Sequence, residues 1–301
     1  MKHTLKITAI LLVMFLFTQL FGLFIINSYK PEIKQVTDSE GNLTNITIYN
    51  LPYGTSPPQE NTPTNNFFSI LIAFIISVTL LIFLMKFNAE VFLRLWFFVV
   101  VTLALAVTFF AFFKNLPYAP ILALLFALPF SFIKVYKRNI LVHNLTELAI
   151  YPGLASIFVP LFNIWTICIL LVLISIYDIY AVWHAGFMQK MARYQINVLK
   201  VFSGFLVPYL IKKNSFKKQL SNKKKVKISV AILGGGDVVF PLILGGVVLY
   251  TFSLFDSLLV IFGATLALGV LFLASKKGKF YPAMPFITAG CFLGLLIALL
   301  I

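Results

Sequence analysis

Charged residues are scarce in this chain of 301 residues. They make up 11% of the sequence, whereas a soluble globular domain contains about 25%. Hydrophobic residues make up 60%. This balance excludes an ordinary soluble domain and predicts an integral membrane protein.

Cysteine is rare as well, since only Cys168 and Cys291 occur and both lie in apolar runs. Two such cysteines form neither a disulfide framework nor the spacing of a metal site, and we expect them to be small buried apolar residues. The glycine run Gly234–Gly236 lies within an apolar stretch and not, as we read it, at a strand-to-helix turn, which argues against a dinucleotide-binding loop. The sequence therefore predicts no metal and no organic cofactor.

Acidic residues are few, nine against 24 basic ones, which gives a net charge of +15. In a soluble protein this excess would suggest a nucleic-acid partner. Here the basic residues lie between the apolar runs, where the positive-inside rule accounts for them. We therefore expect no nucleic-acid partner and expect the lipid bilayer as the surroundings.

Nine stretches are long and apolar enough to cross a hydrocarbon core as helices, which takes about 20 residues each. They cover about 7–27, 67–85, 95–113, 117–133, 140–158, 161–183, 227–250, 254–274 and 280–301. The first is too long for a typical signal peptide and lacks a small-x-small cleavage site, so we expect a retained helix. The sequence predicts an all-α fold with residues 1–301 in a single transmembrane domain.

Lysine and arginine set the expected orientation of these spans. With a cytoplasmic N-terminus, 21 of the 24 basic residues fall in inner segments and three, Lys30, Lys34 and Lys114, in outer ones. The longest inner segment is a basic loop at 184–226. We therefore predict a multi-pass protein of the cell membrane with its N-terminus inside and its C-terminus outside.

Two aspartates lie inside apolar spans, where a carboxylate marks a functional site. Asp178 lies 12 residues before Lys190, and Asp237 lies ten residues after Lys227. At about 1.5 Å per helical residue, both acids are expected at a similar depth, about 18 and 15 Å from these anchors. Because the sixth and seventh spans are antiparallel, the sequence predicts that the two carboxyl groups meet.

Two facing carboxylates cannot both ionise easily, so such a pair holds one proton near neutral pH. It can activate a water and protonate a carbonyl oxygen, as in aspartic proteases. The same pair could carry protons in a transporter or an ion-leak channel, and spacing alone leaves both readings open. The glycines before Asp237 would loosen the helix and admit another backbone, while Pro282 and Pro285 predict an extended or kinked start of the ninth span.

Three motifs resemble those of the presenilin and signal peptide peptidase family of intramembrane aspartyl proteases. Tyr177-Asp178 is similar to its YD motif, Gly234-Gly235-Gly236-Asp237 to its GxGD motif, and Pro282-Ala283-Met284 to its PAL motif with methionine in place of leucine. They lie in the sixth, seventh and ninth spans, and the resemblance covers the whole chain. Its small size is similar to that of prokaryotic, above all archaeal, homologues. Prepilin-type peptidases share GxGD but have fewer spans and no PAL-like motif.

The resemblance implies a presenilin-like fold and an intramembrane aspartyl endopeptidase with Asp178 and Asp237 as catalytic residues. It implies that Tyr177, Gly234, Gly235, Gly236, Pro282, Ala283 and Met284 surround the substrate, which would be a transmembrane helix of another protein. A sixth span that runs from outside to inside implies the presenilin orientation, suited to type I segments, and nothing in the sequence calls for an accessory subunit. Glu147 has no family role, and we expect it to snorkel or to pair with His143; a third functional acid is the alternative.

Overall fold

The computed structural model describes residues 5–37, 43–57, 63–87, 89–137, 139–185, 202–210, 228–275 and 281–301. These residues form mainly α-helices, with two small antiparallel sheets. The helices are α1 (Leu5–Ser28), α2 (Pro63–Lys86), α3 (Glu90–Phe113), α4 (Ala119–Tyr136), α5 (Ile140–Phe158), α6 (Ile164–Tyr180), α8 (Gly235–Thr251), α9 (Leu254–Ala274) and α10 (Met284–Leu300). A 3-10 turn at Val159–Leu161 follows α5, and a π-helical turn at Ala181–Ala185 follows α6.

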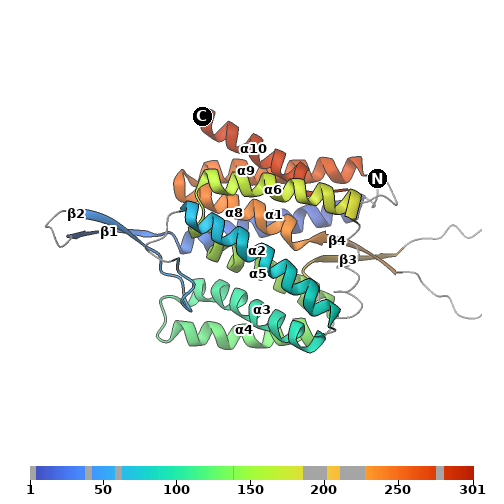
Figure 1. Cartoon of the computed structure of the whole chain (residues 1–301), viewed down its shortest axis with the longest axis horizontal. Coiled ribbons are helices and arrows are strands. Elements are labelled where there is room, and N and C mark those ends of the chain that lie inside the picture. Colours follow the sequence, from blue (N-terminus) through green and yellow to red (C-terminus); the bar gives the residue numbers. More distant parts are fainter. Residues whose placement is uncertain are drawn as a thin grey trace, which may run out of the picture.

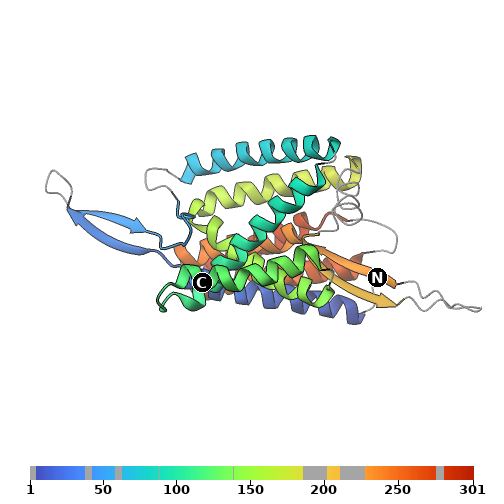
Figure 2. The ribbon, with the colours of Figure 1, turned by 90° about the horizontal axis from the view of Figure 1, so that it is seen from below.

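The helices run side by side in one bundle, and a hairpin projects from each end of it (Figures 1 and 2). Strands β1 (Glu32–Thr37) and β2 (Leu43–Ile48) form the hairpin at the end where the C-terminus lies. Strands β3 (Gly204–Leu210) and β4 (Ile228–Gly234) form the other, at the end where the N-terminus lies. The all-α expectation is therefore confirmed for the bundle and wrong for the two hairpins. Which end faces the cytoplasm stays a prediction.

Several described helices have the length and composition of membrane spans. Five qualify in full, namely α1, α3, α4, the segment Ile164–Trp183 and α9, while Phe67–Ser77, Gly235–Thr251 and Met284–Leu300 are apolar but shorter. Their outer faces carry many exposed large apolar side chains, such as Phe17, Trp165 and Leu266, which soluble monomers avoid in such numbers. The predicted spans 140–158 and 254–274 coincide with the bounds of α5 and α9, although α5 is not among the helices that qualify as candidate spans. That all nine helices cross the membrane stays a prediction.

The predicted span 227–250 is wrong in its first part, because residues 228–234 form strand β4 and the helix begins only at Gly235. In this strand the exposed β-branched residues Val230 and Ile232 alternate with buried Ala231 and Leu233, a period of two. Three glycines then favour a break over helix continuation. The glycines thus lie at a strand-to-helix junction, contrary to our expectation, although among the residues that the structure describes no parallel strand follows to make a βαβ unit.

The basic segment 184–226 also differs from the expected loop, because it contains β3. Its residues 186–201 and 211–226 lie outside the described part of the chain. The two strands pair from Gly204 opposite Gly234 to Leu210 opposite Ile228. The hairpin therefore ends where α8 begins, and this arrangement ties the inner segment to the first turn of α8.

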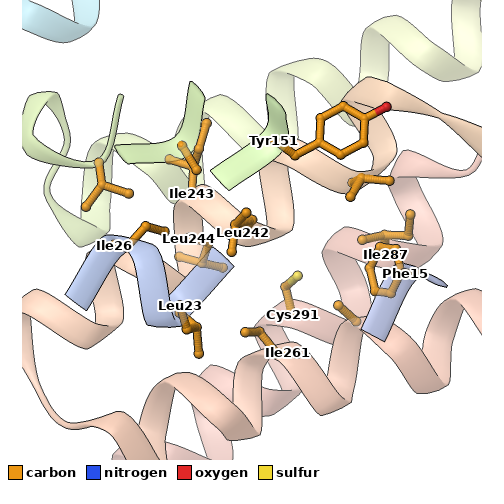
Figure 3. Packing of buried hydrophobic residues seen from close by; sticks show 14 of the residues in the cluster. Phe15, Leu23, Ile26, Tyr151, Leu242, Ile243, Leu244, Ile261, Ile287 and Cys291 are labelled. Atoms are coloured by element: carbon orange, nitrogen blue, oxygen red, sulfur yellow. The ribbon is translucent and has the colours of Figure 1, made fainter. Parts of the chain in front are cut away.

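Helix α8 lies at the centre of the bundle and contacts α1, α5, α6, α9 and α10. From Pro241 to Leu249 every one of its side chains is buried, as a helix enclosed by protein requires. Figure 3 shows the packing around it. The labelled side chains come from α1 (Phe15, Leu23, Ile26), α5 (Tyr151), α8 (Leu242, Ile243, Leu244), α9 (Ile261) and α10 (Ile287, Cys291).

Polar side chains tie α8 to its neighbours. Gln19 Nε2 donates to the Val238 carbonyl at 2.8 Å, Ser257 Oγ to Gly245 at 2.7 Å, and the Tyr250 hydroxyl to Ile26 at 3.0 Å. Lipid tails are as apolar as leucine, so close packing and such interhelical bonds hold helices together in a bilayer. They fix α8, and hence its first turn, relative to α1 and α9.

Helices α9 and α10 approach each other through glycines. A Cβ at Gly263 would overlap the carbonyl oxygen of Gly290, and a Cβ at Gly294 would overlap that of Leu259. Gly290 and Gly294 are spaced as in the GxxxG motif of close transmembrane helix pairs. The backbones are therefore in direct contact, and this contact positions the start of α10.

Candidate functional site

Asp178 lies near the end of α6 and is buried, with 6% of its surface exposed. Its Oδ2 accepts a hydrogen bond from the backbone N–H of Met284 at 3.1 Å. Met284 is the first residue of α10. The N–H groups in the first turn of a helix have no partner within the helix. The start of α10 therefore orients the Asp178 carboxyl group.

Asp237 lies in the first turn of α8, three residues after the N-cap Gly234. A carboxylate at this position is stabilised by the positive end of the helix dipole. The side chain turns back toward the junction with β4, because a Cβ at residue 234 would lie only 3.2 Å from Oδ2. Strand β4 and the glycines therefore set the position of this acid.

The two acids lie on neighbouring helices. Asp178 lies near the end of α6 and Asp237 in the first turn of α8, and these two helices are in contact. Our depth estimate for Asp237 counted ten helical residues from Lys227, and this premise was wrong because residues 228–234 are extended. The contact between α6 and α8 is compatible with a meeting of the two carboxyl groups, which stays a prediction.

The tripeptide Pro282-Ala283-Met284 lies directly beside Asp178. Residues 281–283 precede the helix, as the two prolines predicted, and α10 begins at Met284. Pro282 and Met284 are buried, and Ala283 is half-buried. The motif thus supplies a backbone donor to one acid, and its methionine side chain is not needed for that bond.

The comparisons with known proteins agree with this geometry. The family model described as "Signal-peptide peptidase, presenilin aspartyl protease" matches residues 43–301. The chain belongs to this family. Membership confirms the predicted resemblance to aspartyl proteases of the membrane.

Solved structures of the family share the fold of this chain. One, described as a presenilin family intramembrane aspartate protease in a C222 space group, has a TM-score of 0.61 at 19% identity and covers 97% of this chain and 98% of its own. A second, in a P2 space group, has a TM-score of 0.60 at 18% identity, with 96% of each chain covered. No curated protein sequence matches the chain. At these identities the structures establish the presenilin fold and leave individual residues to be argued from this chain.

The three glycines of the GxGD motif have different surroundings. A Cβ at Gly235 would lie 2.8 Å from Ser203 Oγ and 3.0 Å from the Tyr151 hydroxyl oxygen, so Gly235 allows α8 to approach α5. Gly236 is exposed, and a Cβ there would make only ordinary contact, 3.5 Å from Phe240. Of the three, Gly236 is the one whose surface is open to a bound peptide.

Tyr177 lies beside Asp178 in the sequence but has 41% of its surface exposed. Consecutive helical residues point about 100° apart, so its side chain leaves the helix on a different face from that of Asp178. The proposed role of Tyr177 beside the substrate stays a prediction.

Sequence reasoning missed a polar cluster on α5. We expected Glu147 to snorkel, but it is completely buried, and its main partner is Lys134 of α4, with Nζ 2.6 Å from Oε1. The predicted pairing with His143 occurs as a second contact at 3.7 Å. Lys134 was counted as a solvated loop residue and is instead buried, with 7% of its surface exposed. The signal was present in the helical spacing of His143, Glu147 and Tyr151, which places these residues on one face.

The described residues contain no group of three histidine, cysteine, aspartate or glutamate side chains arranged to hold a metal ion. Cys168 and Cys291 lie on α6 and α10 and are free thiols.

We expect Gly234→Ala to lower kcat by about tenfold or more, because displacement of a reacting group by a fraction of an ångström is costly. The added methyl group would lie 3.2 Å from Asp237 Oδ2 and would push the carboxylate away. Gly236→Ala has no such contact, so it should act mainly on KM. Steady-state cleavage of a single-span substrate separates the two effects, and equal losses of kcat in both variants would contradict this assignment.

Proposed function

We propose that the chain is an intramembrane endopeptidase in which Asp178 and Asp237 form the catalytic dyad. The observation that supports it most is the burial of Asp178 on α6, which contacts the helix whose first turn carries Asp237, in a chain of an aspartyl protease family. Buried like charges favour a state with one shared proton. A dyad in that state is ready to act as acid and base at once.

In the first step, the ionised carboxylate takes a proton from water while the water oxygen bonds to the peptide carbon. The protonated carboxyl group gives its proton to the carbonyl oxygen, which yields a gem-diol. The two acids have then exchanged roles. In the second step one donates to the peptide nitrogen and the other takes a hydroxyl proton as the C–N bond breaks. The dyad returns to its starting state, and the N–H of Met284 keeps Asp178 oriented throughout.

The proposed substrates are single transmembrane segments of other membrane proteins, unwound locally so that the backbone can reach the acids. Strand β4 runs directly into the first turn of α8. Within the described residues β4 pairs only with β3, so no strand occupies its other edge there. An extended peptide that added to this edge would lie beside Asp237. With the predicted orientation, type I segments in the cell membrane would present the matching direction.

The test is cleavage of a single-span substrate by the purified chain in liposomes, with products located by mass spectrometry. We expect products cut within the apolar segment, and an aspartyl-protease transition-state inhibitor should stop their formation. The competing transporter or channel reading predicts proton or ion flux without peptide products. Flux with an intact substrate would overturn the proposal.

A further inference from the structure

One face of α5 meets the outer edge of strand β3. His143, Asn144, Glu147 and Tyr151 follow the helical spacing that aligns side chains on one side. All four contact the hairpin or the junction that follows it. Glu147 and Tyr151 are buried, and His143 and Asn144 are partly buried.

The backbone of Gly204 is held at both of its polar groups. Its N–H donates to Glu147 Oε1 at 3.2 Å, and its carbonyl lies 2.8 Å from His143 Nε2. Lysine is only a donor, so with Lys134 Nζ 3.5 Å from Nδ1, the imidazole accepts there and carries its proton on Nε2. His143 therefore donates to the Gly204 carbonyl. Gly204 has a φ of +149° and no room for a Cβ, so this position requires glycine.

Asn144 holds the next residue on the same edge. Its Nδ2 donates to the Leu206 carbonyl at 2.8 Å, and the Leu206 N–H donates to its Oδ1 at 3.0 Å. The side-chain amide thus pairs with the strand as a peptide unit of a neighbouring strand would. Backbone polar groups alternate between the two edges of a strand, so Gly204 and Leu206 face α5 while Phe205 and Val207 face β4. Pro208, which has no N–H, falls on the α5 edge, where prolines of edge strands occur.

The same face of α5 reaches the first turn of α8. The ring of Tyr151 packs edge-on against Phe205, with centroids 5.5 Å apart at 84°. It also abuts Gly235, where a Cβ would lie 3.1 Å from Cε1. Gly204 pairs across the sheet with Gly234, the N-cap of α8. The contacts of His143, Asn144 and Glu147 with β3 form what we call the clamp. The clamp is one cross-strand pair away from the turn that carries Asp237.

We propose that Glu147, paired with Lys134 and assisted by His143 and Asn144, is a positioning residue that sets Asp237 in place through the β3–β4 hairpin. This inference rests on the proposed function for its effect on catalysis, but the clamp itself can be tested without it. Glu147 touches no reacting atom. A buried carboxylate needs a cation, and Lys134 supplies it from α4. The pair therefore connects α4, α5 and the hairpin at a single point.

The test compares two double variants that remove both buried charges, so that neither leaves an unpaired one. Glu147→Gln/Lys134→Met keeps an oxygen that can accept from the Gly204 N–H, whereas Glu147→Leu/Lys134→Met does not. We expect the leucine variant to show about tenfold faster hydrogen exchange at the Gly204 amide than the glutamine variant, because the bond is lost. Its kcat should be at least about tenfold lower with KM within about threefold, because the acid is displaced and substrate contacts remain.

Thr146→Val is the matched control, because Thr146 is buried on the same turn of α5. Among the described residues its hydroxyl bonds within the helix, to the carbonyls of Val142 and His143. It should leave both readouts at the parent value. If the two double variants exchange and cleave alike, the positioning role is refuted. If the parent chain cleaves no substrate at all but the exchange difference is present, the clamp stands and the proposed protease function fails.

Discussion

Replacement of either Asp178 or Asp237 by asparagine should abolish peptide-bond cleavage and leave the bundle folded. Asparagine has nearly the same shape, and the amide oxygen at position 178 could still accept from the Met284 N–H. The amide of asparagine cannot act as the general acid or the general base that the proposed mechanism requires. Loss of a general acid or base costs about 10²–10⁴ in rate. Because each acid acts in both steps, we expect cleavage to fall by at least about a thousandfold in each single variant.

The measurement is product formation from a single-span substrate in liposomes, with thermal unfolding recorded on the same samples. Asp256→Asn is the matched control, since Asp256 lies in the first turn of α9 and forms a capping box with Ser253. The Asp256→Asn variant should retain cleavage. Its free energy of unfolding should fall by no more than about 2 kcal/mol, the upper end of the usual range for a lost cap. Cleavage at the parent rate by Asp178→Asn or Asp237→Asn would remove the dyad from the mechanism.

The apolar helices were predictable because their signal is local. Long runs of apolar residues predicted most helix bounds to within about five residues, with the start of α8 as the exception, and the bounds of α5 and α9 match in full. The sequence singles out Asp178 and Asp237 for a related reason, since a carboxylate in such a run is costly unless it has a function. Their catalytic role stays a proposal. The non-helical conformation just before α10 was predictable from Pro282 and Pro285, because proline disfavours a regular helix. Each of these inferences needs only a short stretch of sequence.

The strand before α8 was not predictable in this way. A short apolar run such as residues 228–234 fits a strand or a buried helix equally well. What decides it is the pairing with β3, a segment more than 20 residues earlier in a basic region that composition predicts to be a loop. The partner of Glu147 was missed for the same reason. The basic-residue count treats every lysine as solvated, and only the packing of α4 against α5 reveals that Lys134 is buried.

The second large effect concerns the contact between α9 and α10. A methyl group at position 290 would overlap the Gly263 carbonyl oxygen and lie 2.5 Å from Ala267 Cβ. Backbone cannot move aside as a flexible side chain can, so Gly290→Ala must separate the helices. Overpacking of this kind costs about 1–3 kcal/mol. Because α10 also carries the Met284 N–H that holds Asp178, we expect a lower Tm together with a loss of cleavage of about tenfold or more.

Thermal unfolding in detergent and cleavage in liposomes measure the two effects. Gly269→Ala is the matched control on α9, since its Cβ would make only ordinary contact, 3.6 Å from Leu12 Cδ1. Replacement of a helical glycine by alanine at such a site should raise stability by about 0.5–1 kcal/mol. Gly263→Ala and Gly290→Ala open the same gap, so the double variant should cost less than the sum of the single ones. Full additivity, or a Gly290→Ala variant with the Tm of the parent, would mean that backbone contact does not hold α10 in place. The orientation of Asp178 would then need another source.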